Sequence, residues 1–286
     1  MDEACPALSL VIPAYNEAAV IGRAIAEAEV ALGALFPHFE ILVVDDGSTD
    51  GTPDAVRAAL PLAPHTKLLL HPENLGYGAA LRTGFQAATG DLVAFTDADC
   101  QFDLRDLGPM AELAASVPVV AGYRNERKDS RRRRFYSLGY NVLARGVLGT
   151  RVRDCDCALK VFRRDALAKV MPESRGFFVN AEMLTRARLL DLKIAEVPVT
   201  HRPRLGGESK VSIRDIPRTL NTLLAFWWKA LVRGERRPPP KLVLLETRIT
   251  IVDLEPLEAP EPVAGRRPST EGDSPTAAPE PRREAA

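Results

Sequence analysis

The chain has 286 residues, and 46% of them are hydrophobic, which is enough for a substantial core in one large domain or two small ones. The 38 basic and 38 acidic residues cancel to a formal net charge of zero, which excludes a protein that binds polyanions through its overall charge. Four cysteines without a secretory signal pattern predict a cytosolic location, and no apolar segment has the about 20 residues that a membrane-spanning helix needs.

Apolar runs alternate with helical patterns through the first part of the chain. Strands are predicted at residues 8–12, 41–44, 67–70, 92–96 and 117–121, and helices at residues 17–35, 52–60, 76–88 and 104–115. Because strands and helices alternate, the sequence predicts an α/β fold in which a mainly parallel sheet carries helices on both faces.

The second half is less regular. It predicts strands at residues 159–162 and 194–200, and helices at residues 135–148, 165–170, 179–190 and 213–232. The last 53 residues hold ten of the 23 prolines, so they predict a disordered tail, with some strand character only at residues 242–254. We therefore expect a main domain at residues 1–212, an amphipathic helix at residues 213–233 and a proline-rich tail at residues 234–286.

Two carboxylates follow the apolar run at residues 92–96. Asp97 and Asp99 stand one residue apart, and Gln101 comes two residues later. Ligands of open α/β sheets bind beyond the carboxyl ends of the strands, and paired carboxylates there suit a hard divalent cation that also binds phosphate. For an isolated pair of this kind, a polar strand end with two solvated aspartates is the favoured interpretation.

Two further polar segments end the first two predicted strands. Tyr15 offers a flat face for stacking a base, and Glu17 lies at a predicted helix start, where the helix dipole stabilises a carboxylate. Asp45 and Asp46 end the second strand, where a carboxylate can accept hydrogen bonds from a base or a ribose hydroxyl. Each segment alone also fits a helix cap or an acidic turn, but together they predict one nucleotide-binding edge of the sheet.

Four segments of the chain, taken in their order along it, resemble motifs of the family 2 glycosyltransferases of GT-A fold. The resemblance is greatest to the dolichol-phosphate mannose synthases and related polyprenyl-phosphate glycosyltransferases, of the type without transmembrane helices. The four segments are Pro13–Glu17, Asp45–Thr52, Asn74–Gly78 and Asp97–Gln101. The resemblance covers about residues 8–233 and implies an inverting enzyme that uses a nucleotide-diphospho-sugar with Mg²⁺ or Mn²⁺, with residues 1–212 as its catalytic domain.

The resemblance also assigns roles to individual residues. It implies nucleoside contacts from Pro13, Tyr15, Glu17 and one or both of Asp45 and Asp46, and nucleotide-sugar contacts from Asp97 and Ala98. It further implies that Asp99 and Gln101 ligate the metal. Cys100 stands where relatives often have leucine.

Two basic segments complete the resemblance. Residues 124–134 contain seven basic residues in eleven, and relatives bind the lipid phosphate in this region, at positions matched by Arg124, Arg133 and Ser137. Arg204 and Lys210 match a family segment whose cations neutralise the leaving diphosphate. Taken alone, these segments also fit a solvated basic loop and a glycine turn.

Two acidic positions remain open. Glu182 matches a catalytic acidic position near the donor sugar in the family, and the alternative is an exposed carboxylate on a helix. Asp154 and Lys160 match another family segment, but Ala158 and Leu159 replace its usual glycine and aromatic residue.

The expected reaction is transfer of mannose or glucose, from GDP-mannose or UDP-glucose, to polyprenyl or dolichyl phosphate. A phosphate acceptor needs no general base, whereas a hydroxyl acceptor on a sugar or polysaccharide needs one, for which Glu182 or Asp154 is the candidate. A nucleotidyltransferase and a non-catalytic nucleotide-sugar-binding protein are less favoured alternatives. The amphipathic pattern at residues 213–232 predicts a helix that either packs on the catalytic domain or attaches peripherally to the cytoplasmic face of a membrane. A membrane-protein partner is one option in the second case. We expect no nucleic-acid partner.

Overall fold

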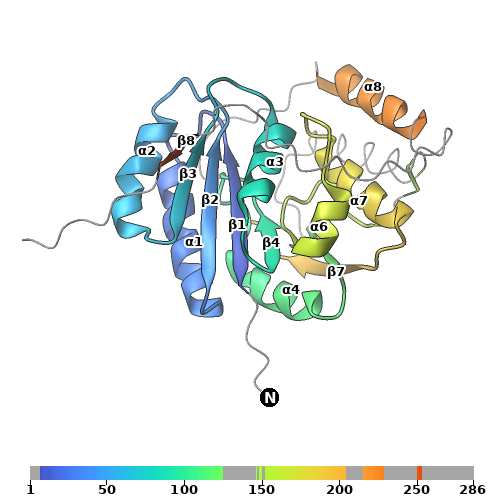
Figure 1. Ribbon diagram of the computed structural model, residues 1–286, viewed down its shortest axis with the longest axis horizontal. Helices are drawn as coiled ribbons and strands as arrows, with labels where there is room; N and C mark the ends of the chain where they lie inside the picture. The colour runs from blue at the N-terminus through green and yellow to red at the C-terminus, as the bar shows by residue number, and fades with distance from the viewer. Residues whose placement is uncertain are drawn as a thin grey trace, which may run out of the picture. The chain divides into compact units, whose positions relative to one another are not determined.

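The computed structural model describes residues 7–124, 146, 148–149, 152–203, 215–228 and 250–252 (Figure 1). All of them belong to one structural unit, Met1–Leu254, and the second unit, Glu255–Ala286, lies outside the described residues. Most of the predicted helix at residues 135–148, most of the basic segment at 124–134 and nearly all of the tail lie outside them as well.

The described strands form one sheet with the order β7-β5-β6-β4-β1-β2-β3-β8. Its strands are β1 (Leu8–Ala14), β2 (Phe39–Asp45), β3 (Thr66–Leu70), β4 (Leu92–Phe95), β5 (Val119–Arg124), β6 (Lys160–Arg163), β7 (Ile194–Val199) and β8 (Thr250–Val252). Strands β3, β2, β1 and β4 run parallel, β6 is antiparallel to both β4 and β5, and β7 is parallel to β5. The prediction of a mainly parallel sheet is therefore confirmed.

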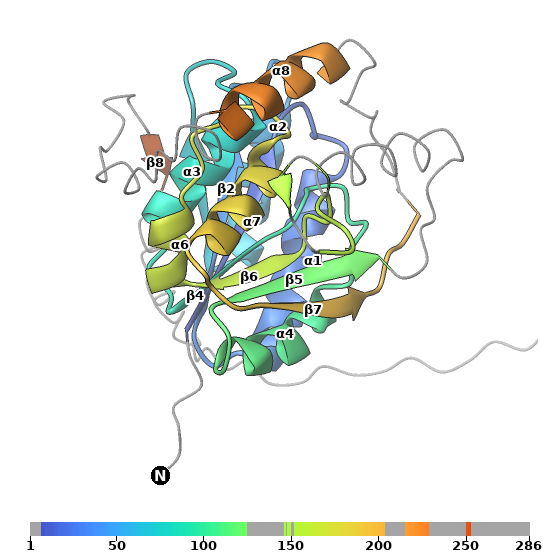
Figure 2. The same ribbon diagram turned by 90° about the vertical axis from the view of Figure 1, so that its right-hand side faces the viewer.

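Helices cover both faces of this sheet (Figures 1 and 2). They are α1 (Ile21–Leu35), α2 (Thr52–Ala59), α3 (Tyr77–Ala87), α4 (Leu107–Ala114), α6 (Arg164–Val170), α7 (Val179–Leu189) and α8 (Asp215–Trp227). Short 3₁₀ turns follow α2 at Leu60–Leu62 and precede α4 at Leu104–Asp106. Helices α1, α2 and α4 lie on one face, and α3, α6 and α7 lie on the other.

The structure differs from the sequence prediction at the first strand. Pro13 was expected to end that strand, but β1 continues through Pro13 to Ala14, paired with β2. Pairing between β1 and β4 stops at Val11, so a proline at position 13 removes no hydrogen bond on the β4 side. The helix expected from Glu17 begins only at Ile21, because residues 17–20 form a turn in which the Glu17 carbonyl accepts from the amides of Val20 and Ile21.

The sheet edge at β3 is covered by part of the predicted tail. Residues 250–252 form β8, which pairs antiparallel with β3 in the register Leu69 opposite Ile251. The strand character expected at residues 242–254 is therefore present at the three of these residues that the structure describes. Within the described part of the chain, no helix combines the length and the hydropathy that crossing a bilayer requires.

Candidate active site

The carboxyl ends of β1, β2 and β4 carry the three polar segments and lie next to one another in the sheet. Hydrogen bonds join the first two segments directly. The Asn16 amide donates to Ser48 Oγ over 2.9 Å, and the Glu17 amide donates to Thr52 Oγ1 over 2.8 Å. The predicted convergence of these segments at one edge is therefore present, with Tyr15 and Glu17 half-buried in the turn before α1.

The neighbouring carboxylates of Asp45 and Asp46 are both buried but have different partners. Asp46 accepts from the amides of Leu75 and Gly76 over 2.9 and 2.8 Å and contacts His71 Nδ1 at 2.7 Å. Asp45 accepts from the Ser48 amide through Oδ2, and its Oδ1 has no hydrogen-bond partner among the described residues. Asp46 therefore holds the loop before α3, whereas Asp45 retains a buried acceptor atom for a ligand.

Close backbone contacts require glycine at two positions, one after β2, where the loop between β3 and α3 passes, and one in the first turn of α3. Gly47 has a φ of +67°, and a Cβ there would lie 2.2 Å from the Glu73 carbonyl carbon. Gly78 would place a Cβ 2.1 Å from the carbonyl oxygen of Ser174, and its amide donates to the Arg175 carbonyl over 2.8 Å. The start of α3 therefore packs directly against residues 174–175.

Tyr77 at the start of α3 is a site residue that the sequence reasoning did not single out. Its hydroxyl donates to Asp97 Oδ1 over 3.0 Å, and its ring stacks on Phe177 with centroids 5.5 Å apart. Burial raises the pKa of Tyr77, and the negative charge of Asp97 raises it further, so the hydroxyl stays protonated and donates. The only sequence signal was its place in the glycine-containing segment Asn74–Gly78.

Asp99 and Gln101 form a tight turn after β4. Both are buried, the Gln101 amide donates to Asp99 Oδ1 over 3.2 Å, and Cys100 between them has a left-handed φ of +56°. Ala98 is buried behind this turn. The described residues contain no cluster of three His, Cys, Asp or Glu side chains that could hold a metal. One carboxylate and one amide oxygen suit a Mg²⁺-like ion that takes its other ligands from substrate phosphates and water.

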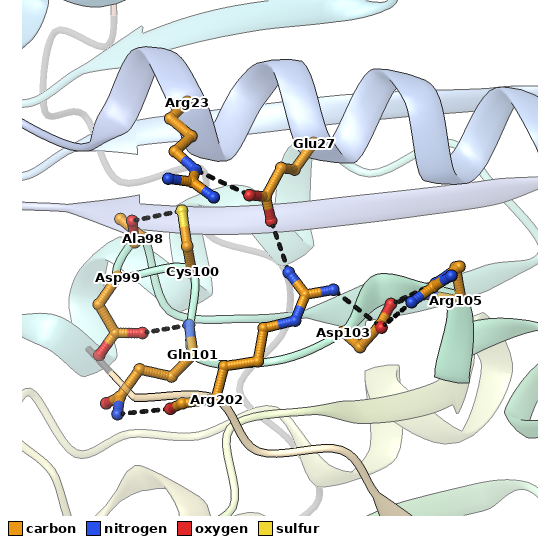
Figure 3. A network of polar contacts seen from close by, with 9 residues as sticks. All are labelled: Arg23, Glu27, Ala98, Asp99, Cys100, Gln101, Asp103, Arg105 and Arg202. Atoms are coloured by element: carbon orange, nitrogen blue, oxygen red, sulfur yellow. Dashed lines mark hydrogen bonds and ion pairs between the residues drawn. The ribbon is translucent and has the colours of Figure 1, made fainter. Parts of the chain in front are cut away.

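The Asp99–Gln101 turn is connected to the segment after β7 (Figure 3). The Arg202 amide donates to the Gln101 carbonyl over 2.7 Å, and Gln101 Nε2 donates to the Arg202 carbonyl over 3.3 Å. Arg204 and Lys210 lie outside the described residues, but Arg204 follows only two residues after Arg202 in the chain.

Arg124, which the sequence assigned to the acceptor phosphate, already has a partner. It ends β5 and forms two hydrogen bonds with Asp154, Nε to Oδ2 over 2.8 Å and Nη2 to Oδ1 over 3.0 Å, with both side chains buried. Burial opposes its charge, but the hydrogen bonds and the charge of Asp154 raise the pKa of Arg124. Any phosphate that Arg124 binds must therefore share it with Asp154. Arg133 and Ser137 lie outside the described residues.

Glu182 in α7 is buried rather than exposed, so the alternative of an exposed helix carboxylate is wrong. Its oxygens accept from the amides of Glu173 and Ser174, each over 2.9 Å, and from Arg186 Nε over 2.9 Å. These bonds fix the 173–175 segment that packs against α3, so the contacts in the structure are those of a positioning group.

Lys160 is the most buried cation near the site. Its Nζ donates to the carbonyls of Cys155 and Cys157 and to Asn180 Oδ1, and it lies 5.5 Å from the centre of the Phe95 ring. Burial lowers the pKa of Lys160. Its contacts hold the 155–157 turn and α7 against β4, so its role is structural.

A family profile and individual relatives agree on the family to which this chain is similar. The profile of glycosyl transferase family 2 matches residues 9–171. Glycosyltransferase AglD of Haloferax volcanii is 33% identical over 79% of this chain and 38% of its own length. Undecaprenyl-phosphate 4-deoxy-4-formamido-L-arabinose transferase of Sodalis glossinidius is 34% identical over 76% of this chain and 66% of its own length. The chain therefore spans less than two thirds of either relative.

Among solved structures, glucosyl-3-phosphoglycerate synthase of Mycobacterium tuberculosis, in complex with Mn²⁺, UDP and glucosyl-3-phosphoglycerate, has a TM-score of 0.59 and 23% identity. The match covers 79% of this chain and 80% of that one. At this identity the likeness establishes a shared fold.

Proposed function

Because the chain belongs to glycosyl transferase family 2 and has the GT-A fold, we propose that it is an inverting hexosyltransferase that moves mannose or glucose from a nucleotide-diphospho-sugar to polyprenyl phosphate. The observation that carries this proposal is the pair of hydrogen bonds between Gln101 and Arg202. They support placement of the Arg204–Lys210 segment beside the Asp99–Gln101 turn, as one diphosphate site requires.

In this mechanism, each described residue has a limited task. Asp45 Oδ1 would accept a hydrogen bond from the nucleoside, and Tyr77 would hold Asp97 in place beside the donor. Asp99 and Gln101 would hold a divalent cation, which when bound supplies Lewis-acid stabilisation of the leaving diphosphate. Arg204 and Lys210 would add positive charge to the same diphosphate.

The reaction itself needs no general base. A phosphate monoester has a second pKa of about 6 and is mostly dianionic at neutral pH. Its oxygen would form a bond to the anomeric carbon while the bond from that carbon to the diphosphate oxygen breaks. The bonding electrons leave with the nucleoside diphosphate, and the configuration at the anomeric carbon inverts.

The partners of two carboxylates favour a phosphate acceptor over a hydroxyl acceptor. Asp154 and Glu182 are the candidate bases for hydroxyl activation, and each is buried and paired with an arginine, Arg124 and Arg186 respectively. Because an arginine already occupies oxygens of both carboxylates, an incoming hydroxyl would have to compete with that arginine for them. The related undecaprenyl-phosphate transferases are named for the same acceptor class.

We also propose that the protein attaches peripherally to the cytoplasmic face of a membrane; exposed apolar residues in helix α8 and just after it support the attachment itself. Leu224 and Trp228 are 52% and 51% exposed, whereas Leu223 is fully buried against the core. Vesicle flotation with anionic lipid is expected to recruit the full chain and to lose the double variant Leu224→Glu, Trp228→Glu. Val30→Glu is the matched control, since Val30 is an exposed apolar residue on α1. Equal flotation of all three proteins, or flotation of none, would contradict membrane attachment.

A donor screen tests the reaction. The full chain is incubated with GDP-mannose or UDP-glucose, short-chain polyprenyl phosphate and Mg²⁺ or Mn²⁺, and lipid-linked sugar is measured by mass spectrometry. Asp99→Ala is expected to reduce transfer by about 100-fold or more with the fold intact, whereas the control Asp54→Ala removes an exposed carboxylate and retains activity. Near-normal transfer by Asp99→Ala would refute the metal assignment, and transfer only to a sugar hydroxyl would refute the acceptor.

A further inference from the structure

Arg202 lies at the centre of a polar network beside the Asp99–Gln101 turn, and the mechanism above gives its side chain no task. Figure 3 shows its guanidinium between two carboxylates from different parts of the chain. Nη1 contacts Glu27 Oε2 of α1 at 3.0 Å, and Nη2 contacts Asp103 Oδ2 at 2.8 Å. The guanidinium therefore joins α1 to the segment that follows β4.

The main chain of Arg202 contacts the proposed metal ligand. Its amide donates to the Gln101 carbonyl, and its carbonyl accepts from Gln101 Nε2. Because a carbonyl accepts hydrogen bonds but cannot donate them, the second contact fixes which end of the Gln101 amide faces Arg202. The nitrogen faces Arg202, and the oxygen, which is the end that binds a hard cation, is left for the side of the turn where Asp99 lies (Figure 3).

We propose that Arg202 is a positioning residue: its side chain, anchored by Glu27 and Asp103, holds its main chain where it orients the Gln101 amide oxygen for a divalent cation. The inference rests on the proposed function for the presence of that cation. A group that orients a metal ligand through a hydrogen bond typically changes metal affinity by about 10- to 100-fold when it is removed.

The network contains two matched controls. Arg105 forms an ion pair with the same Asp103, and Arg23 forms one with the same Glu27. Both side chains are mostly exposed, and among the described contacts neither arginine has a hydrogen bond to Gln101. Removing either one takes away an arginine of the same network and leaves the link between Arg202 and Gln101 in place.

The experiment measures Mn²⁺ binding by the full chain in the presence of GDP or UDP, from the electron paramagnetic resonance signal of free Mn²⁺. This readout does not require transfer. Arg202→Ala is expected to weaken Mn²⁺ binding about 10-fold, whereas Arg105→Ala and Arg23→Ala stay within about twofold of the parent. Arg202→Lys is expected to fall between, because an ammonium cannot present two forked donors to Glu27 and Asp103 together.

A double-mutant cycle separates positioning from a general structural role. If Arg202 acts through Gln101, adding Arg202→Ala to Gln101→Ala gives little further loss of Mn²⁺ affinity. Additive losses, or parental Mn²⁺ binding by Arg202→Ala together with a lower urea midpoint, would overturn the inference. If Arg202→Ala does not fold, Arg202→Lys and Glu27→Gln serve in its place, and parental Mn²⁺ binding by both overturns it equally.

Failure of the inference is distinguishable from failure of the proposed function. A parent protein that binds no Mn²⁺ with either nucleotide overturns the metal-dependent mechanism and the inference with it. A parent that binds Mn²⁺ normally, with an Arg202→Ala variant that does the same, overturns only the role of Arg202.

Discussion

The adjacent carboxylates Asp45 and Asp46 allow a sharp test, because the same substitution should lower stability at one position and nucleotide affinity at the other. Asp46→Asn replaces one acceptor oxygen by an amide nitrogen. If the remaining oxygen stays at the position of Oδ1, the bonds to Leu75 and His71 survive, but the new NH₂ group faces the Gly76 amide, so two donors oppose each other. The opposite orientation loses the bond to the Leu75 amide and keeps the His71 contact only if the imidazole changes its tautomer.

The magnitude of the Asp46→Asn effect follows from these contacts. At least one hydrogen bond to a charged group is lost, which costs about 1.5–3 kcal/mol, and a buried donor is left without an acceptor. We expect the free energy of unfolding to fall by about 2–4 kcal/mol. Urea denaturation followed by circular dichroism measures this change.

The matched variant Asp45→Asn should spare stability and weaken nucleotide binding. Its Oδ2 position can still accept from the Ser48 amide, and the position of Oδ1 has no donor among the described residues to oppose an NH₂ group. Stability is therefore expected to change by less than about 1 kcal/mol, while GDP or UDP affinity, measured by calorimetry, falls about 10- to 100-fold for a lost bond to a charged group. Equal loss of stability in both variants, or parental nucleotide affinity in Asp45→Asn, would refute this division of roles.

Two further predictions concern packing and pH. Gly84→Ala in α3 would place a Cβ 2.3 Å from Cγ1 of the buried Val11 and is expected to lower the free energy of unfolding by about 1–3 kcal/mol. Gly22→Ala in α1 meets nothing within 4 Å and should raise the free energy of unfolding by about 0.5–1 kcal/mol. Equal urea midpoints for the two variants would contradict this prediction. Burial raises the pKa of Cys100 to about 11 and of Cys157 to about 12, so the folded state holds these protons more tightly than the unfolded state, whose thiols titrate near about 8.5. Their stabilising contribution is complete below that pH and is lost as pH rises through 11 to 12. Urea midpoints measured from pH 8 to 11 should therefore fall less in the double variant Cys100→Ala, Cys157→Ala than in the parent protein. An equal fall in the two proteins would contradict the assignment.

Much of the candidate site could be predicted from the chain alone, because its signals are local. Apolar runs and the polar residues that end them are visible in sequence, and neighbouring parallel strands must bring their carboxyl ends together. The placement of Asp45, Asp99 and Gln101 follows from that rule. The roles of Asp46 and Glu182 did not, because each is decided by donors on a distant segment, at residues 71–76 and 173–174.

The sequence by itself determined the alternation of strands and helices, the strand-end motifs and thus the family, since these depend on residue type and spacing along the chain. Only the tertiary structure decided which charged groups are already paired, such as Arg124 with Asp154, and which segment reaches the Asp99–Gln101 turn, as Arg202 does across about a hundred residues from Gln101. The physical reason is that burial and pairing depend on what the fold brings within about 3 Å, and separation along the chain carries no information about that distance.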